Sequence, residues 1–425
     1  MKVFIQNNPI YYACVKYTLG VFAHNKKISF EFSAEKDNAD LRIDENPDSD
    51  LPIATDFYKK LAEKKFHHEN FFQKDCTIIA PNGQPDLIAT CFYMINSLQE
   101  YGAVNKDAIG RFTYHASYQQ KFNNVRENIV QKLFDKLAQH PRFSGVRAVN
   151  EPTAVFISHD IDNINSAWIE DGFAALKRGQ FHHLLRLFVN AAMHKPDWFN
   201  MDKIMAIHDE AGLKSTFFWL VNKGRSVNGL YNADYDVRAK KIQDTLQMVK
   251  KRGFENGIHK SVSGESFAEE SSKLGFKPLA NRYHYLKFTL PDAYKELERA
   301  GIKLDASLGF SEQFGFRNNY GQAFQPFNLE EKKTYNFAEV PLHVMDRTFY
   351  HMKTPTEGIS EKIIDFFEAN KYNCTLSLLW HNNFFNSLKY RGYMTEYKKV
   401  IAYLYENNFK SLSQQEIIDK FPDLK

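Results

Sequence analysis

Beyond residue 150, short apolar runs alternate with longer amphipathic stretches. The apolar runs have the length of strands: Thr153–Ser158, Lys214–Leu220, Phe254–His259, Ala280–Leu286, Lys303–Ser307, Phe337–Leu342 and Cys374–Trp380. Helical spacing of apolar residues marks Phe199–Ala211, Asp292–Ala300 and Ile359–Asn370 between them, and Asn163–Asp197 after the first run. This alternation predicts an α/β fold with a parallel sheet, and seven units favour closure into a barrel.

The residues before 150 follow a different, mixed pattern. Strands are predicted at Lys27–Phe32 and Thr77–Ala80, and helices at Leu87–Leu98 and Asn123–Gln139. The polar, turn-rich stretch Pro141–Pro152 reads as a joint between two domains. We therefore expect a smaller N-terminal α/β domain over residues 1–145 and a barrel over residues 151–425. At the far end of the chain, Ser413 and Glu416 form a capping-box pattern that predicts a last short helix.

Composition narrows the class of protein. The chain has 425 residues, of which 43% are hydrophobic and 25% charged, and a net charge of +4. These values are ordinary for a globular protein, and no basic cluster indicates nucleic-acid binding. Gln6–Pro9 interrupts any signal-peptide core, and no stretch approaches the roughly 20 apolar residues of a membrane-spanning helix. Four cysteines without metal spacing favour free thiols, and we expect a cytoplasmic location.

Polar residues of interest follow the first predicted strand of the barrel. That strand ends in His159-Asp160-Ile161-Asp162. In extended chain, Asp160 and Asp162 share one face, and His159 points to the other. Two neighbouring carboxylates repel each other unless a cation lies between them or their pKa values are split into separate roles. Taken alone, the pair is explained as well by a helix cap and a solvated carboxylate.

Three further strand ends carry similar chemistry. His259 ends one apolar run, His381 ends another, and a third carries Arg282 and His284 on one face. Any one of these histidines, by itself, is more typical of a structural residue than of a catalyst. Carboxyl ends of parallel strands meet at one edge, however, and this set of carboxylates, imidazoles and a guanidinium suits metal-assisted hydrolysis.

Seven blocks in sequence order carry a specific resemblance over most of residues 151–421. They read FISHDID, KSTFFWL, GIHKS, RYHYLKF, DASLGFSEQFGFR, FAEVPLHVMDRTF and LLWHNNFF. This part of the chain resembles the polysaccharide deacetylase superfamily, also called the NodB-homology or carbohydrate esterase family 4 fold, in its HDxD branch. The N-terminal stretch QPDLIATCFYMINSLQE is similar to an α/β module that often precedes such domains. The resemblance implies a distorted (β/α)7 barrel with a smaller N-terminal α/β domain.

The resemblance also implies roles for individual residues. Asp160 matches the general base, Arg282 the arginine that orients it, and His381 the general acid. Asp162 and His259 match ligands of a divalent metal, which in this family is usually zinc. The metal would polarise an N-acetyl carbonyl, and the base and acid would serve the attacking water and the leaving amine.

The chain departs from the family pattern after His259. The usual motif is HxxxH, and the position of its second histidine is occupied by Ser263. Catalytic zinc normally has three protein ligands, so another residue must complete the set. His284 is one candidate, and His159 is another if the strand twists sharply. The remaining possibility is a weak, altered or absent metal site.

The segment Leu308–Phe327 is rich in aromatic residues and contains Arg317. It could form a loop that closes over a glycan, or its rings could bury the loop onto the barrel, which we favour for most of them. Arg317 and Trp380 are retained as substrate-binding candidates. Met345–Arg347 could line the same opening or make a structural contact elsewhere.

The sequence therefore predicts a metal-dependent deacetylase that hydrolyses N-acetyl or O-acetyl groups on a carbohydrate substrate, a glycan or its precursor. One alternative is a glycan-binding or scaffold protein of the same fold with weakened catalysis, which the missing HxxxH histidine favours. Another is a hydrolase of a different carbon–nitrogen amide bond.

Overall fold

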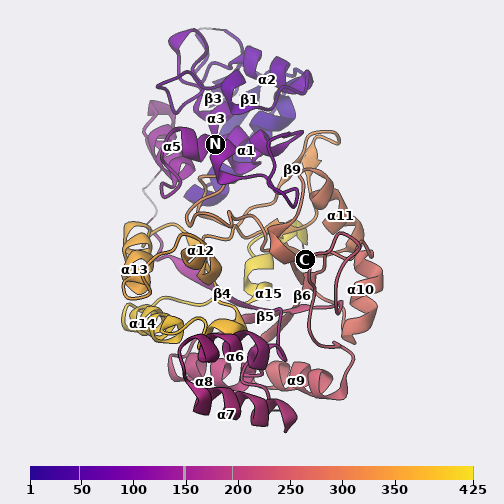
Figure 1. Cartoon of the computed structure of the whole chain (residues 1–425). Helices are drawn as coiled ribbons and strands as arrows, with labels where there is room; N and C mark the ends of the chain where they lie inside the picture. The colour runs from indigo at the N-terminus through magenta and orange to yellow at the C-terminus, as the bar shows by residue number, and fades with distance from the viewer. Residues whose placement is uncertain (47, 147–149, 194, 425) are drawn as a thin grey trace.

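The computed structural model describes residues 1–46, 48–146, 150–193 and 195–424. Figure 1 shows two parts: an N-terminal module at one end of the molecule and a larger part built around one curled sheet. Helices surround the outer side of that sheet, from α13 (Ile359–Ala369) and α14 (Tyr393–Glu406) round to α10 (Phe267–Leu274) and α11 (Asp292–Ala300). The predicted joint between the two parts includes residues 147–149, which lie outside the described residues.

The curled sheet contains eight strands in the order β11-β8-β7-β6-β5-β4-β13-β12, and each neighbouring pair is parallel. The strands are β4 (Ala154–Ile161), β5 (Thr216–Leu220), β6 (Glu255–Lys260), β7 (Ala280–Tyr283), β8 (Leu304–Asp305), β11 (Ala338–Glu339), β12 (Val344–Met345) and β13 (Thr375–Leu379). Within the described chain, no ladder joins β11 to β12, so the barrel is open there. The predicted α/β fold with a barrel-like parallel sheet is confirmed.

Two details of the sheet differ from the prediction. The two-residue strand β12 adds an eighth member, because a run that short leaves no apolar pattern to detect. Strand β7 also ends at Tyr283, and a 3-10 turn, η6 (His284–Leu286), follows it. Tyr285 and Leu286 have φ values of 60° and 52°, a left-handed conformation that a strand cannot contain.

The remaining helices of this part are α6 (Ala167–Lys177), α7 (Phe181–Ala192), α8 (Met201–Glu210), α9 (Lys240–Lys251), α12 (Asp346–His351) and α15 (Gln414–Ile418). Helices α6 and α7 confirm the predicted helical excursion after the first strand, and the capping box of Ser413 and Glu416 begins α15. Strands β9 (Phe327–Asn328) and β10 (Lys333–Thr334) form a small antiparallel pair. None of the helices that the structure describes is long and apolar enough to cross a membrane.

The N-terminal module has a three-stranded parallel sheet in the order β2-β1-β3. Its elements are β1 (Lys2–Ile5), α1 (Tyr12–Lys26), β2 (Glu31–Ser33), β3 (Leu41–Ile43), α2 (Thr55–Ala62), α3 (Leu87–Ile95), α4 (Tyr118–Lys121) and α5 (Ile129–Ala138). The other 3-10 turns of the chain are η1 (His68–Asn70), η2 (Pro81–Gly83), η3 (Leu98–Glu100), η4 (Tyr114–Ala116), η5 (Pro141–Phe143), η7 (Asn382–Phe384) and η8 (Pro422–Leu424).

Predictions for this module were partly correct. The prediction of a strand at Thr77–Ala80 is wrong: Ile79 N donates to Thr90 Oγ1, and its carbonyl accepts from Asp86 N, so this segment is tied to the start of α3. Asp86 caps α3 by accepting a 2.7 Å hydrogen bond from Ala89 N. The predicted helix at Asn123–Gln139 begins later, at Ile129, because Asn128 is its N-cap.

The aromatic segment Leu308–Phe327 lies between the barrel and the N-terminal module. Its rings are buried, and several contact rings of the module: Phe327 with Tyr17 and Phe92, Tyr320 with Phe134, and Phe310 with Tyr114. The segment therefore holds the two parts together. Most of its rings are structural, as favoured from the sequence, although they face the module as well as the barrel. The four cysteines are free thiols, as expected.

Two buried carboxyl groups lie side by side inside the sheet. Glu339 of β11 pairs in register with Asp305 of β8, and both side chains are excluded from solvent. Burial, together with the neighbouring Asp305, raises the pKa of Glu339 well above its usual range. Burial also raises the pKa of Asp305, and a protonated Glu339 can donate to that neighbour while its Oε1 accepts from Leu308 N.

We expect Glu339→Gln to become more stable than the wild-type protein as pH rises. The folded pKa of Glu339 exceeds the unfolded value of 4.5, so its stabilising contribution is complete below pH 4.5 and is lost as pH rises through the folded pKa. Glutamine keeps the donor and cannot ionise. The stability difference should grow by about 1.4 kcal/mol per pH unit above the unfolded pKa, measured by urea unfolding at several pH values. The exposed Glu357→Gln serves as control, and a pH-independent difference for Glu339→Gln would contradict the assignment.

Candidate metal centre and catalytic site

The carboxyl ends of four strands, β4, β6, β7 and β13, bring the candidate residues into one cluster. Asp160 and Asp162 of the β4 end share a face, as the alternation predicts, and His259 of β6 lies against both. The chain beyond Asp162 is fixed by Asp234, whose carboxylate accepts hydrogen bonds of 2.7, 2.8 and 2.6 Å from the backbone N–H groups of residues 164–166. This anchor keeps the two aspartates in place at the start of a loop.

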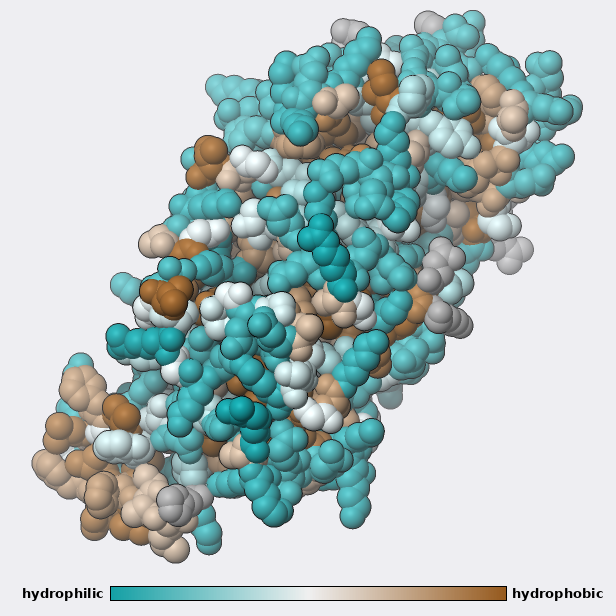
Figure 2. All heavy atoms as spheres, turned by 90° about the vertical axis from the view of Figure 1, so that its right-hand side faces the viewer, coloured by the Kyte–Doolittle hydropathy of each residue, from teal (hydrophilic) through white to brown (hydrophobic). Residues whose placement is uncertain are grey.

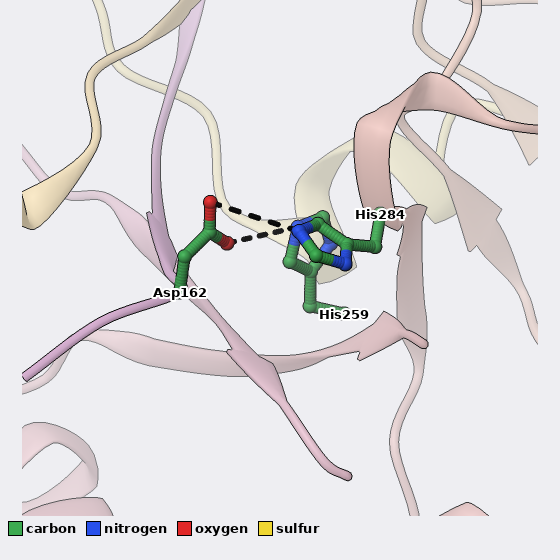
Figure 3. A group of neighbouring side chains, drawn as sticks. All are labelled: Asp162, His259 and His284. Atoms are coloured by element: carbon green, nitrogen blue, oxygen red, sulfur yellow. Dashed lines mark ion pairs between the residues drawn. The ribbon is translucent and has the colours of Figure 1, made fainter. Parts of the chain in front are cut away.

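Three of these side chains have the composition of a metal site. Asp162, His259 and His284 each offer one ligand atom, and these atoms lie within 4.8 Å of one another. Figure 3 shows the carboxylate of Asp162 facing both imidazoles; His259 Nε2 is 3.3 Å from Oδ1, and His284 Nε2 is 3.8 Å from Oδ2. All three are buried, and Oδ1 of Asp162 has no hydrogen-bond donor of good geometry among the described residues. A carboxylate and two imidazoles fit a divalent cation such as zinc.

Burial and neighbouring charges shift the pKa values of the three side chains in different directions. His259 Nδ1 lies 2.9 Å from the carbonyl of Arg282, so Nδ1 carries the hydrogen and the Nε2 lone pair faces the cluster. Burial lowers the pKa of His284 to about 3, which keeps its imidazole neutral. Burial opposes ionisation of Asp162, but the surrounding imidazoles, His284 foremost, hold its pKa well below the usual range. Burial likewise lowers the pKa of His259, and the carboxylates of Asp160 and Asp162 outweigh it and raise that pKa.

The two other positions considered for the third ligand lie elsewhere. Ser263 accepts a 2.7 Å hydrogen bond from Asn222 Nδ2 and takes no part in the cluster. His159 points to the opposite face of β4, where Nδ1 lies 2.7 Å from the carbonyl of Trp380 and the ring packs against Phe217. His284 reaches the cluster because β7 stops at Tyr283 and turns.

Asp160 has the surroundings of an oriented base. Arg282 Nη1 donates to Asp160 Oδ1 at 2.9 Å and to Ser158 Oγ at 2.9 Å, and its Nε donates to the carbonyl of Ala306. The guanidinium is fully buried and lies over the ring of Phe218. One oxygen of Asp160 is therefore held by Arg282, and the other, Oδ2, faces His259 and the centre of the cluster.

His381 lies on the opposite flank with its own carboxylate. Its Nδ1 is 2.7 Å from Asp346 Oδ1, and its backbone N–H donates to Asp346 Oδ2. Its Nε2 faces the cluster, 3.8 Å from Asp162 Oδ2 and 4.0 Å from Asp160 Oδ2. Burial lowers the pKa of His381, but Asp346 outweighs this effect and raises the pKa, which favours the protonated ring.

Asp346 and Arg347 are the site residues that the sequence did not assign. They follow the short strand β12. The sequence left open whether they line the opening of the barrel or make a structural contact, and Asp346 does both, because its contact is with His381. Arg347 is half-buried, and its pKa is raised, against the effect of burial, by Tyr390, Asp162 and Asp346. Its Nε has no acceptor in the described part of the chain, so a donor remains free beside the cluster.

The structure does not bring the two substrate-binding candidates to this cluster. Arg317 is buried against the N-terminal module, where Nη2 and Nε pair with Glu100 at 2.6 and 2.8 Å. Trp380 is fully buried, and its ring packs against Tyr393 and Tyr397. Both side chains are buried and therefore inaccessible to a bound molecule. The sequence pattern that selected them does not show which segment of the chain covers a loop.

A family model described as a family of unknown function, DUF7033, matches residues 3–140. No curated protein matches the sequence. Among solved structures, the chain is similar to a probable polysaccharide deacetylase from Pseudomonas aeruginosa PAO1, with 11% identity, 63% of this chain and 90% of that chain covered, and a TM-score of 0.39. It is equally similar to a PuuE allantoinase, with 11% identity, 63% and 90% covered, and a TM-score of 0.39. At these values the likeness assigns no activity to this chain.

Proposed function

We propose that the chain is a metal-dependent hydrolase that removes acetyl groups from an amino-sugar glycan or its precursor. One observation carries this proposal: a buried Asp–His–His ligand set lies between a carboxylate clamped by Arg282 and an imidazole paired with Asp346. Amide hydrolysis needs these three functions, since it requires an electrophile, a base for water and an acid for the leaving amine.

The residues of the chain divide the proton transfers between them. Asp160 Oδ2 accepts a proton from the attacking water, while Arg282 holds Oδ1 and fixes the direction of the carboxylate. His381 donates its Nε2 proton to the leaving nitrogen, and Asp346 stabilises the ring in the orientation and charge state that this transfer needs. Water and amide thus become acetate and a free amine. The gap of 4.0 Å between His381 Nε2 and Asp160 Oδ2 exceeds a hydrogen bond, so base and acid are not quenched by each other.

Asp162, His259 and His284 would hold the metal, for which we propose zinc. When bound, a zinc ion acts as a Lewis acid toward the scissile carbonyl and stabilises charge that develops on its oxygen. We further propose that the half-buried Arg347 binds a polar group of the sugar beside the reacting amide. O-acetyl hydrolysis and hydrolysis of another carbon–nitrogen bond would use the same groups, so substrate comparison is needed to choose between them.

His284→Ala is expected to weaken zinc binding at least about 100-fold, because loss of an outer partner of a ligand alone costs about 10- to 100-fold. His259→Ala should have an effect of equal size if His284 is a full ligand. Zinc content of the purified protein and competition with a coloured chelator measure the affinity, and acetate release from N-acetylated oligosaccharides measures the activity.

Ser263→Ala is the matched control, since it alters the position of the absent HxxxH histidine without touching the cluster. Its zinc affinity should equal that of the wild-type protein. Unchanged affinity in His284→Ala would reject His284 as ligand. Absence of both bound metal and acetate release in the wild-type protein, with zinc or cobalt supplied, would reject the enzyme and favour a glycan-binding protein of the same fold.

A further inference from the structure

Helices α6 and α7 expose an unusual number of large apolar side chains. Nine are at least 43% exposed: Trp168, Ile169, Phe173, Leu176, Phe181, Leu185, Phe188, Val189 and Met193. Of the twelve residues in α7, only Leu187 is fully buried. Figure 2 shows hydrophobic residues gathered at the end of the molecule where Figure 1 places α6 and α7. We call this surface the α6–α7 patch. Contiguous apolar surface of this kind marks an interaction site.

The charges around the α6–α7 patch have one sign. Among residues 163–193 and 195–197, the acidic side chains are all engaged: Glu170 pairs with Lys389, Asp171 is buried, and Asp197 pairs with Arg186. The basic side chains of Lys177, Arg178 and Lys195 are exposed and have no carboxylate partner in the described chain. Arg178 donates to the carbonyl of Leu388, and Lys177 lies over the ring of Phe173, so the apolar patch is bordered by exposed cations whose charge no described carboxylate neutralises.

We propose that the α6–α7 patch binds the surface of a bilayer that contains anionic lipids. Amphipathic helices with aromatic and aliphatic residues on one face and lysine or arginine at its border lie in the membrane interface, with the apolar face among the acyl chains. Phe181, Leu185 and Phe188 are spaced by four and three residues and form one such face on α7. Lys177 and Arg178, at the C-terminal end of α6, are positioned to meet lipid phosphates.

Charge also argues against a second copy of the chain as the occupant. In a symmetric dimer through this patch, the same surface of both copies would meet, and the bordering lysine and arginine side chains of the two copies would face each other. Such juxtaposition of like charges disfavours association, whereas an anionic headgroup layer neutralises the same cations.

The patch leads toward the catalytic site. A groove of about 1100 Å³ runs beside α6 and α7 and is also lined by Tyr350 and Lys389. Tyr350 contacts Tyr390, whose ring stacks on Phe384 at 3.8 Å, and Phe384 lies 6.0 Å from the ring of His381. Docking through the patch would place the site near glycans carried on lipid; this last consequence rests on the proposed function, whereas membrane binding does not.

Flotation with vesicles tests the proposal. The full-length protein should float with vesicles in which a quarter of the phosphatidylcholine is replaced by phosphatidylglycerol, and less with phosphatidylcholine alone. Phe181→Ser/Leu185→Ser/Phe188→Ser should weaken partitioning about 100-fold or more. Lys177→Gln/Arg178→Gln should weaken it about 30-fold on the anionic vesicles only, since each cation near such a surface contributes about 1 kcal/mol.

Two control variants keep the test specific. Val104→Ser/Val227→Ser/Tyr405→Ser removes equally exposed apolar side chains elsewhere, and Lys362→Gln/Lys398→Gln removes exposed cations from α13 and α14. Both should float like the wild-type protein, and thermal unfolding should show that all variants fold. Failure of the wild-type protein to float would overturn the proposal. So would equal loss in the controls, or a dimer in sedimentation velocity that the α7 triple variant abolishes without any vesicle binding.

Discussion

Asp160→Asn is expected to lower kcat for acetate release by about 10³- to 10⁴-fold, a loss in the upper range for general acid–base groups. Asparagine has the size of aspartate, and its Oδ1 can still accept from Arg282, so the arrangement of β4 and β7 should persist. It cannot take a proton from water, which is the role that we propose for Oδ2. The variant should retain zinc, because Asp160 is outside the ligand set of Asp162, His259 and His284.

Asp171→Asn provides the matched control for this substitution. Asp171 is also fully buried, but it accepts hydrogen bonds from Ser387 and from Lys389 N, away from the cluster. Its variant should have nearly normal kcat. A kcat within tenfold of wild type in zinc-loaded Asp160→Asn would rule out Asp160 as the base; loss of zinc in that variant would instead place Asp160 among the ligands.

Arg317→Met is expected to destabilise the folded protein by about 3–5 kcal/mol, the usual cost of removing one partner from a buried ion pair. The guanidinium makes two contacts with Glu100, donates to the carbonyl of Gly309, and lies between the rings of Phe288 and Phe310. Burial lowers the pKa of Arg317, and Glu100 outweighs that effect and raises it. Without Arg317, the carboxylate of Glu100, 3% exposed, would remain buried without a counter-charge.

Glu100→Gln/Arg317→Met should recover most of the lost stability, because no uncompensated charge remains. Urea unfolding of the two single variants and the double variant gives the coupling energy directly. Lys132→Met, which removes one partner of an exposed pair with Glu127, should cost no more than about 1 kcal/mol. If Arg317→Met costs as little as Lys132→Met, or the double variant is no more stable than the single one, the buried pair does not join the two parts of the molecule.

The sequence predicted the barrel well because its strands are apolar and end in polar residues. Alternation alone set Asp160 and Asp162 on one face and His159 on the other, and the structure agrees. It also placed Arg282 and His284 on one face, and both contact the aspartates, but His284 does so through the turn after β7 and not through strand alternation. The period-two alternation of side chains holds within a strand, so it predicts the faces of residues up to the strand end and not beyond it.

What the sequence could not show depends on tertiary contacts. Strand β12 has two residues, too few for a pattern, so the partner of His381 at its end was not assigned. The strands of the N-terminal module have three or four residues, and β1 and β3 were missed for the same reason. Arg317 was selected for its place in an aromatic loop, and nothing local to that loop indicates that Glu100, 217 residues away, neutralises it.

The turn at His284 has a consequence for how this site could evolve. Ser263 belongs to a polar network with Ser261 and Asn222, and Ser261 in turn bonds to the fully buried Glu270. An imidazole introduced at position 263 would have to displace that network before it could reach a metal. The two arrangements of the third ligand are therefore epistatic alternatives: while the polar network around Ser263 is intact, one substitution at position 263 does not supply an HxxxH ligand. Ser263→His should fail to rescue His284→Ala.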